Sequence, residues 1–274
     1  MLLDNMKDKV IIITGASSGI GKALAYQFGA KKAKVVLAAR YITSLNAIVS
    51  DLVLLGVQAL AVQTDVSIEK DCQNLIEKTI EEFGRIDVLI NNAGISMRAL
   101  FIDLNLDVMR RLMDTNYWGT VYCTKFAMPH LLKASGSLVG VISIGGYIGM
   151  PGRSAYAASK FAVRGFLDTV RVENRKTGLH VLVVAPGFTT SNIRRVALLA
   201  DGTLQGETPR DESHMMPAEK VAMYVYTAVK LRKRHLILTF LEGKLTVFLG
   251  KFVPKFLDRL IYNTFAKELD SPLK

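Results

Sequence analysis

Tyr156 and Lys160 are the two residues of this sequence best suited to acid–base chemistry. They stand four positions apart within residues 154–160, and side chains at that spacing share one face of a helix. A free tyrosine has a pKa of about 10, and a nearby cation favours the phenolate and lowers that pKa. The pair predicts a tyrosine that exchanges a proton near neutral pH. By itself the pattern is weak, because a lysine follows a tyrosine at this spacing in many helices by chance.

A glycine-rich segment, residues 14–21, indicates a second kind of chemistry. It follows a short apolar run at residues 10–13 and precedes a helix-compatible stretch that continues to Phe28. Glycines at such a place allow a tight turn and let backbone N–H groups at the start of a helix approach a pyrophosphate. Glycine-rich turns also occur without a ligand, but the strand before this one and the helix after it favour dinucleotide binding.

The end of the next apolar run indicates which dinucleotide. That run, residues 35–39, is followed by Arg40, where an NAD site would place a carboxylate on the ribose 2′-hydroxyl. No carboxylate is present, and the planar guanidinium of Arg40 can instead bind a 2′-phosphate through two hydrogen bonds. The position predicts NADP in preference to NAD, against the alternative of an ordinary solvated arginine.

Short apolar runs that alternate with helix-compatible stretches must position these residues. The runs are rich in Val, Ile and Leu, as in strands that are covered on both faces. Between them, stretches such as residues 69–83 have apolar side chains at helical spacing. The alternation predicts a parallel sheet with helices on both faces and a site at the carboxyl ends of the strands. The expected strands are residues 10–13, 35–39, 59–62, 88–90, 138–142, 181–185 and 236–238.

Length and composition fit one domain, residues 1–274. Half of the residues are hydrophobic and 22% are charged, which excludes a globally disordered chain. Cys72 and Cys123 are too few for a disulfide framework and match no metal spacing, so we expect a reducing compartment and no metal. No uncharged apolar run approaches the roughly 18 residues of a membrane span, and there is no signal-peptide pattern, so we expect a cytoplasmic protein.

Two segments depart from the alternation. Residues 187–216 show little periodicity and are expected to form a mobile substrate loop or lid. Residues 240–274 are expected to form an amphipathic helical extension with Pro254 in the first turn of a helix. Residues 230–274 hold ten Lys or Arg and four Asp or Glu, which is a net +6 of the formal charge of +11.

Three explanations for this basic amphipathic tail stay open. It could pack on its own domain, pair with a second subunit, or lie on an anionic membrane surface as a peripheral contact. Nucleic acid is not expected as a partner, because the sequence has no RNA-module or zinc-finger signature.

From about Lys7 to Thr239 the chain resembles the classical short-chain dehydrogenase/reductase family. The Asn-Asn-Ala-Gly motif of that family matches residues 91–94, and its Pro-Gly motif matches residues 186–187. The resemblance implies a Rossmann-type doubly wound sheet of about seven parallel strands. It implies catalytic roles for Asn116, Ser143, Tyr156 and Lys160. It implies NADP-binding roles for Gly15, Ser17, Ser18, Gly19, Ile20, Gly21, Arg40, Asp65, Val66, Asn92, Tyr156, Lys160, Pro186, Gly187 and Ser191.

The resemblance also implies a mechanism, in which hydride passes between nicotinamide and a carbonyl carbon while Tyr156 supplies the proton. Ser143 would hydrogen-bond the carbonyl oxygen. Lys160 would hold the nicotinamide ribose and lower the pKa of Tyr156, and Asn116 would position a water. Ile144 stands where a second serine is common in the family, which should not stop catalysis.

A second departure concerns the residue that touches the carboxamide of nicotinamide. The family commonly has a threonine after the Pro-Gly motif, and this sequence has Ser191 with Thr189 and Thr190 beside it. Which of the three hydroxyls takes that role stays open.

Apolar side chains near the expected site predict a hydrophobic carbonyl substrate. Residues 146–152 and the long tail are similar to the hydroxysteroid dehydrogenase and 3-ketosphinganine reductase branches, which implies a lipid-like or steroid-like ketone or aldehyde. The alternatives are a 3-oxoacyl thioester reductase and a non-catalytic nucleotide-binding or membrane-surface scaffold. We expect a homodimer or homotetramer. The expected pocket lining is Ile95, Met97, Tyr147, Met150, Phe188, Val196, Leu198 and Leu199.

Overall fold

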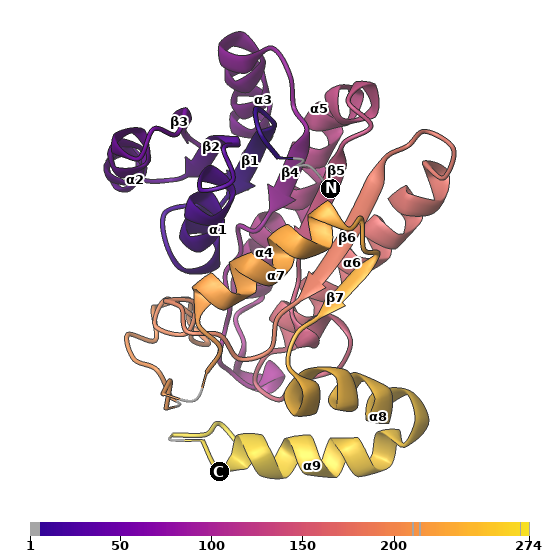
Figure 1. Ribbon diagram of the computed structural model, residues 1–274. Coiled ribbons are helices and arrows are strands. Elements are labelled where there is room, and N and C mark those ends of the chain that lie inside the picture. Colours follow the sequence, from indigo (N-terminus) through magenta and orange to yellow (C-terminus); the bar gives the residue numbers. More distant parts are fainter. Residues whose placement is uncertain (1–5, 210, 214, 269, 274) are drawn as a thin grey trace.

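A computed structural model describes residues 6–209, 211–213, 215–268 and 270–273 of the chain. Its described part contains a seven-stranded parallel sheet with the strand order β3-β2-β1-β4-β5-β6-β7 (Figure 1). This confirms the predicted sheet, and each predicted run overlaps one strand. The strands are β1 (Val10–Thr14), β2 (Lys34–Ala39), β3 (Ala59–Gln63), β4 (Val88–Asn91), β5 (Ser137–Val141), β6 (His180–Ala185) and β7 (His235–Ile237).

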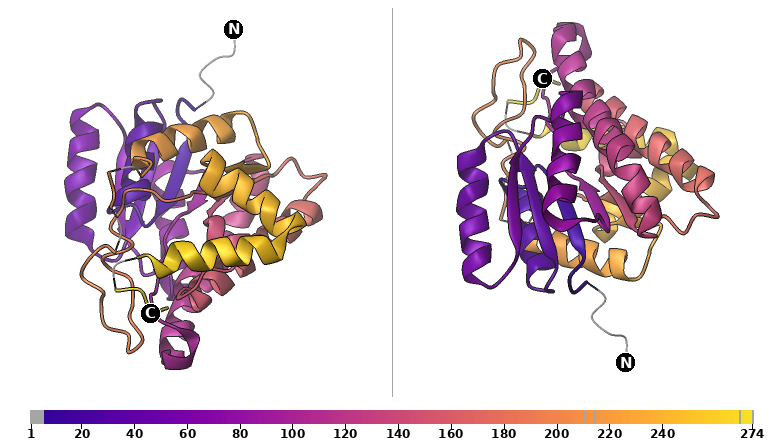
Figure 2. Two further views of the ribbon diagram at one scale, coloured as in Figure 1. Left: turned by 90° about the horizontal axis from the view of Figure 1, so that it is seen from below. Right: turned by 90° about the horizontal axis from the view of Figure 1, so that it is seen from above.

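Helices cover both faces of the sheet, as Figure 2 shows. Alternate side chains of each strand serve the two sides: Ile11 and Ile13 pack in one core, Val10 and Ile12 in the other. Because both faces are buried, the strands are apolar at nearly every position. The first core lies under α1 (Gly19–Gly29), α2 (Ile42–Leu54) and α7 (Ala218–Lys230), and the second under α3 (Glu69–Phe83), α5 (Gly119–Lys133) and α6 (Ser154–Glu173).

The strand order reverses between β1 and β4, and this reversal positions the site. The chain winds outward from β1 through β2 to β3, then returns to the other side of β1 as β4. The connections that leave β1 and β4 therefore diverge at their carboxyl ends and leave a crevice, which is where ligands bind in such sheets. Between β4 and α5 the chain forms α4 (Leu106–Leu112) and a π-helical turn at Met113–Trp118.

The loop after β6 is attached to the rest of the domain at its middle. The backbone N–H of Leu198 donates to Ser96 O at 2.9 Å, and Leu198 O accepts from the N–H of Arg98 at 2.8 Å. The described part of residues 187–216 contains no helix or named strand. Positions 210 and 214 of this predicted loop, and positions 269 and 274 of the predicted extension, lie outside the described residues.

The predicted helical extension is present as two short helices. A π-helical turn at Phe240–Leu245 leads into α8 (Thr246–Phe252), and α9 (Pro254–Ala266) follows with Pro254 in its first turn, as predicted. Both helices lie across the carboxyl-terminal edge of the sheet (Figure 1). Leu257 and Phe265 of α9 are buried. One side of the extension therefore packs on its own domain.

Candidate active site

The glycine-rich loop after β1 has a shape that only glycine allows. Gly15 has φ +64°, and a Cβ atom there would lie 2.8 Å from the Cα of Ala93. A Cβ atom on Gly21 would lie 2.2 Å from the carbonyl oxygen of Gly15. Because such atoms cannot approach so closely, the two glycines let the loop turn tightly between the segment after β4 and the start of α1.

Asn92 fastens this loop to the segment after β4. Its side-chain amide donates to Thr14 O at 2.9 Å and to Gly15 O at 3.3 Å. In return, Thr14 Oγ1 accepts from the backbone N–H groups of Asn92 and Ala93, both at 3.0 Å. Both amide hydrogens of Asn92 therefore point to the loop, so its predicted part in cofactor binding is joined by a structural one.

The start of α1 offers the donors that a pyrophosphate requires. Ser18 is the N-cap of α1 in an extended conformation, and its side chain makes no capping hydrogen bond. The N–H groups of the first turn of a helix lack partners within the helix and lie at its positive end. Ser17, Gly19 and Ile20 lie in the same turn and are partly exposed. The cradle made by the glycines therefore fits a dinucleotide phosphate.

The predicted adenosine end of the site lies where β2 and β3 end. Ala16 N donates to Ala38 O at 3.2 Å, which brings the end of β2 beside the glycine loop. Arg40 follows, exposed, with its guanidinium 5.7 Å from the ring centre of Tyr41.

After β3, Asp65 accepts through Oδ1 from the N–H and the hydroxyl of Ser67 at 3.0 and 2.7 Å. Val66 beside it is 7% exposed.

Asn116 lies in the π-helical turn before α5, a type of turn that is often found at functional sites. Its Oδ1 accepts from the N–H of Ile95 at 2.8 Å, and its Nδ2 donates to Ile95 O at 3.0 Å and to Ser159 Oγ at 2.9 Å. The side chain is 1% exposed. Asn116 therefore fixes the segment after β4 against α6.

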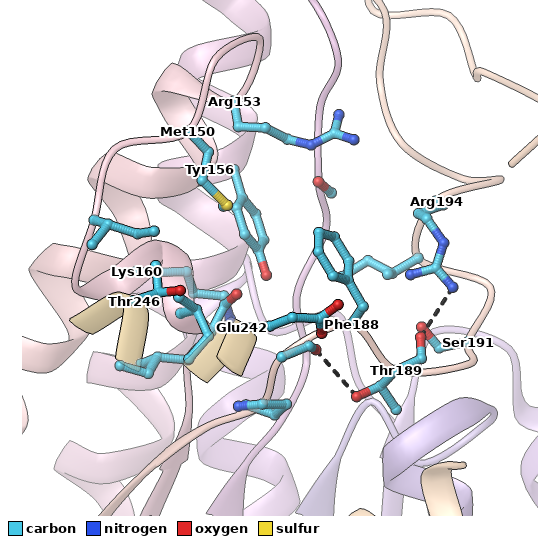
Figure 3. Close-up of a pocket in the computed structure, with 18 of the residues that line it drawn as sticks. Met150, Arg153, Tyr156, Lys160, Phe188, Thr189, Ser191, Arg194, Glu242 and Thr246 are labelled. Carbon is cyan, nitrogen blue, oxygen red and sulfur yellow. Dashed lines mark hydrogen bonds between the residues drawn. The ribbon is translucent and has the colours of Figure 1, made fainter. Parts of the chain in front are cut away.

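Tyr156 and Lys160 face the cavity from the first turns of α6, and Ser143 approaches from the end of β5. Lys160 Nζ lies 5.9 Å from the ring centre of Tyr156 and donates to Val141 O at 3.0 Å. A Cβ atom on Gly94 would lie 3.2 Å from Lys160 Nζ, so the glycine leaves room for the ammonium group. Figure 3 shows Tyr156 and Lys160 opposite Phe188, Thr189 and Ser191 across the pocket. The structure thus brings three of the four predicted catalytic side chains to one cavity.

The pKa values of these groups are set first by burial. Burial raises the pKa of Tyr156, and the hydrogen bond with Ser143 and the charges of Arg153 and Arg194 oppose that rise without cancelling it. Burial lowers the pKa of Lys160 to about 8. The prediction that Lys160 lowers the pKa of Tyr156 is therefore wrong for the net shift, because desolvation disfavours both charged forms. The phenol holds its proton at neutral pH.

The pocket has a volume of about 400 Å³, within the usual range for small-molecule sites. Of the eight residues predicted to line it, only Met150 and Phe188 are found there. Met97 and Leu198 are buried in a core beneath the site, whereas Val196 is 42% exposed. In their place the pocket is lined by apolar side chains of α9, namely Leu257, Leu260, Ile261 and Phe265.

The structure separates the three hydroxyls after Gly187. Thr190 is exposed, whereas Thr189 and Ser191 line the pocket. The hydroxyl of Thr189 donates to Gly187 O at 3.2 Å. A Cβ atom on Gly19 would lie 3.2 Å from the Cβ of Ser191, which places Ser191 at the junction of the pocket and the glycine loop.

Three charged residues line the pocket although the sequence did not predict them there. Arg153 stands just before α6 and donates to Met97 O. Arg194, 8% exposed, donates to Glu212 Oε1 at 2.6 Å and so ties together two parts of the loop after β6. It also donates to Thr189 O at 3.0 Å, as Figure 3 shows. Glu242 enters from the turn after β7. No local pattern marks them, since each reaches the pocket through the path of its segment in space.

A model of the short chain dehydrogenase family matches residues 9–199. The chain belongs to the short-chain dehydrogenase family. Over 273 residues it is 33% identical to the protein named dehydrogenase/reductase SDR family member 7B of Rattus norvegicus, a match that covers 97% of this chain and 84% of that protein. It is 38% identical over 214 residues to 11-beta-hydroxysteroid dehydrogenase A of Arachis hypogaea, covering 77% of this chain and 60% of that one.

Two solved structures share the fold of this short-chain dehydrogenase. An alcohol dehydrogenase from Thermococcus sibiricus, complexed with 5-hydroxy-NADP, superposes with a TM-score of 0.76 at 24% identity, over 85% of this chain and 96% of that one. A short-chain dehydrogenase from Burkholderia phymatum in complex with NAD also gives 0.76 and 24%, over 84% of this chain and 89% of that one. The family is one of oxidoreductases that act on CH–OH groups with a nicotinamide cofactor.

Proposed function

We propose that this protein is an NADP(H)-dependent oxidoreductase that interconverts a hydrophobic, lipid-like or steroid-like ketone or aldehyde and its alcohol. One observation carries the proposal: Ser143, Tyr156 and Lys160 line the same pocket of about 400 Å³ as the apolar side chains of α9. A relative named as a hydroxysteroid dehydrogenase supports the substrate class. The proposed catalytic unit is a single domain, residues 1–274.

The preference for NADP in this proposal depends on Arg40. The structural relatives include one complex with an NADP derivative and one with NAD, so the family alone leaves both open. Arg40 is exposed at the end of β2, where the chain carries no carboxylate, and can bind a 2′-phosphate. Ser191, beside Gly19 in the pocket, is the hydroxyl that we propose for the nicotinamide carboxamide.

When bound, a nicotinamide cofactor would supply or accept the hydride. For reduction of a carbonyl group, the protein must add a proton to the oxygen, and the raised pKa of Tyr156 keeps that proton on the phenol until it is needed. Ser143 hydrogen-bonds the substrate oxygen beside it. Lys160 would hold the ribose, and its ammonium group, whose pKa burial lowers to about 8, would stabilise the phenolate that remains after transfer.

Asn116 has a narrower proposed role than the resemblance implied. Its amide already makes three hydrogen bonds, to Ile95 and Ser159. We propose that it fixes the segment after β4 beside Lys160. The positioning of a water by Asn116 stays a prediction.

A substrate panel tests this function. The full chain would be incubated with NADPH and, separately, with a long-chain ketone, a ketosteroid, retinal and an acetoacetyl thioester, and cofactor oxidation would be followed by absorbance at 340 nm. We expect the highest kcat/KM with the long-chain ketone or the steroid. The highest value with the thioester would favour the 3-oxoacyl thioester reductase. Cofactor binding without turnover of any carbonyl would favour the scaffold.

Self-association and location belong to the same proposal. Trp118 and Phe161 are 43% and 42% exposed near α5 and on α6, and Trp118 stacks on Tyr122 with ring centres 5.6 Å apart. Exposed aromatic side chains of this kind favour a homodimer or homotetramer, which light scattering of the purified chain would test.

Among the described helices, none has the length and apolar character to cross a membrane. We propose a cytoplasmic protein with a peripheral membrane contact.

A further inference from the structure

The C-terminal cap, residues 240–266, has an outer face that is apolar and exposed. Phe248, Phe252 and Phe256 are 57%, 60% and 60% exposed, and the rings of Phe248 and Phe252 lie against each other with centres 4.6 Å apart. A soluble surface rarely gathers several large apolar side chains in one patch unless something binds there. The cap therefore presents a surface that is built for a partner.

The inner face of the same cap is the roof of the substrate pocket. Leu257, Ile261 and Phe265 line the pocket, and Leu257 and Phe265 are only 3% and 9% exposed. At 3.6 residues per turn, Phe256 points away from the side that Ile261 and Phe265 occupy. The apolar stripe of α9 is thus too broad for the domain to cover, and part of it faces outward.

Two residues belong to both faces. Leu241 and Leu260 line the pocket, yet they are 68% and 46% exposed. A side chain that borders the cavity and also faces solvent marks its rim. The pocket therefore opens at the edge of the exposed apolar face.

Exposed basic side chains outnumber acidic ones in the same cap. Lys244, Lys251, Lys255 and Arg259 of the cap are all exposed, against two acidic residues, Glu242 and Asp258. The ammonium group of Lys251 lies 5.5 Å from the ring centre of Phe252, so charge and apolar surface are adjacent. Bulky apolar residues flanked by lysine and arginine are the combination that holds a helix in an anionic membrane interface.

We propose that the outer face of the cap docks on an anionic lipid bilayer, and that the pocket opens toward the bilayer so that an apolar ketone enters from the lipid. A second copy of the chain fits less well, because a two-fold contact through this face would bring the cations of both copies together. The proposed docking depends only on the exposed apolar and basic side chains of the cap. The entry route rests on the proposed function.

Vesicle flotation of the full chain tests the docking. We expect the protein to float with vesicles of phosphatidylcholine and phosphatidylserine at low salt, and at least tenfold less with phosphatidylcholine alone or at high salt. The double variants Phe252→Ser/Phe256→Ser and Lys251→Gln/Lys255→Gln should each lose at least tenfold in bound fraction, as an apparent partition coefficient. None of these four residues lines the pocket.

Matched controls lie on distant helices. Leu54 on α2 is 86% exposed, and Lys70 and Lys78 are exposed on α3. Leu54→Ser and Lys70→Gln/Lys78→Gln should float like the unchanged protein. No binding of the unchanged protein to anionic vesicles, or equal losses in the cap and control variants, would overturn the docking. So would a cap variant that changes a dimer into a monomer without any vesicle binding in the unchanged protein, since the face would then be a subunit contact.

Activity measurements separate the entry route from the proposed function. The cap variants should keep their kcat/KM for a short water-soluble ketone and lose about tenfold for a long-chain ketone carried in anionic vesicles. Equal effects on both ketones would overturn the entry route. If the unchanged protein reduces neither ketone but still floats with anionic vesicles, the proposed function fails and the docking stands.

Discussion

Replacing the buried Lys160 by methionine should make the protein more stable at neutral pH while abolishing turnover. Lys160 is 4% exposed, and burial lowers its pKa from 10.5 to about 8. Each pKa unit corresponds to about 1.4 kcal/mol, so keeping this ammonium charged in the folded protein costs roughly 3 kcal/mol. The methionine variant loses the hydrogen bond to Val141 O, which lowers its free energy of unfolding by about 1 kcal/mol. The expected gain in the free energy of unfolding is about 2 kcal/mol at pH 7.

The gain should depend on pH in a defined direction. Because the pKa of Lys160 is about 8 in the folded chain and about 10.5 in the unfolded one, only the unfolded chain holds this proton between those values. The stability of the unchanged protein therefore rises with pH in that window, relative to Lys160→Met. The advantage of the variant is complete below about pH 8 and is lost by about pH 10.5.

Guanidinium unfolding without added cofactor, followed by the fluorescence of Trp118, would measure this difference at pH 7 and pH 10. Trp118 is the single tryptophan of the chain. Lys78→Met, at an exposed position on α3, is the control and should change stability little at either pH. A variant that is less stable than the unchanged protein at pH 7, or a difference that stays constant with pH, would show that burial of the ammonium group carries no such cost.

Three other substitutions, at Arg40, Tyr156 and Gly21, test the remaining parts of the site, and a fourth at Gly165 is a control. NADPH should bind at least tenfold tighter than NADH, a difference of about 1.4 kcal/mol, and Arg40→Asp should reverse or abolish that preference; equal affinities of the unchanged protein in a fluorescence titration would contradict it. Tyr156→Phe should keep cofactor affinity and lower kcat by roughly 10²–10⁴-fold, so more than a tenth of the rate remaining would exclude general acid catalysis. Gly21→Ala, whose Cβ would lie 2.2 Å from a carbonyl oxygen, should prevent cofactor binding. Gly165→Ala, with open space at the same test within α6, should instead raise the unfolding free energy by about 1 kcal/mol; thermal unfolding and NADPH titration would show whether the two differ.

The sheet and the cofactor loop were predictable from the sequence because their signals are local. A strand that is covered on both faces is apolar at nearly every position, so the run at β1 is visible without knowledge of its neighbours. The glycine loop directly follows that strand and opens α1, so its chemistry and its context are adjacent in the chain. Tyr156 and Lys160 likewise share one helix, which fixes their relative position before any tertiary contact forms.

The pocket lining was only partly predictable because it depends on how distant segments meet. Met97 and Leu198 have the right chemistry for a pocket wall, but they pair with each other across two loops and are buried beneath the site. Arg194 reaches the pocket because Glu212 holds it there. No spacing rule within a single segment contains that information.

Periodicity and propensity act over a few residues, so the order of amino acids was enough to predict the sheet, the glycine loop, and an amphipathic tail with Pro254 in the first turn of a helix. Which side of that tail is buried depends on how it packs against the rest of the chain, because one apolar stripe is divided between Phe265 inside and Phe256 outside. Tertiary packing also sets the direction in which the pKa of Tyr156 shifts, because desolvation depends on everything packed around the phenol and not on the lysine one turn away.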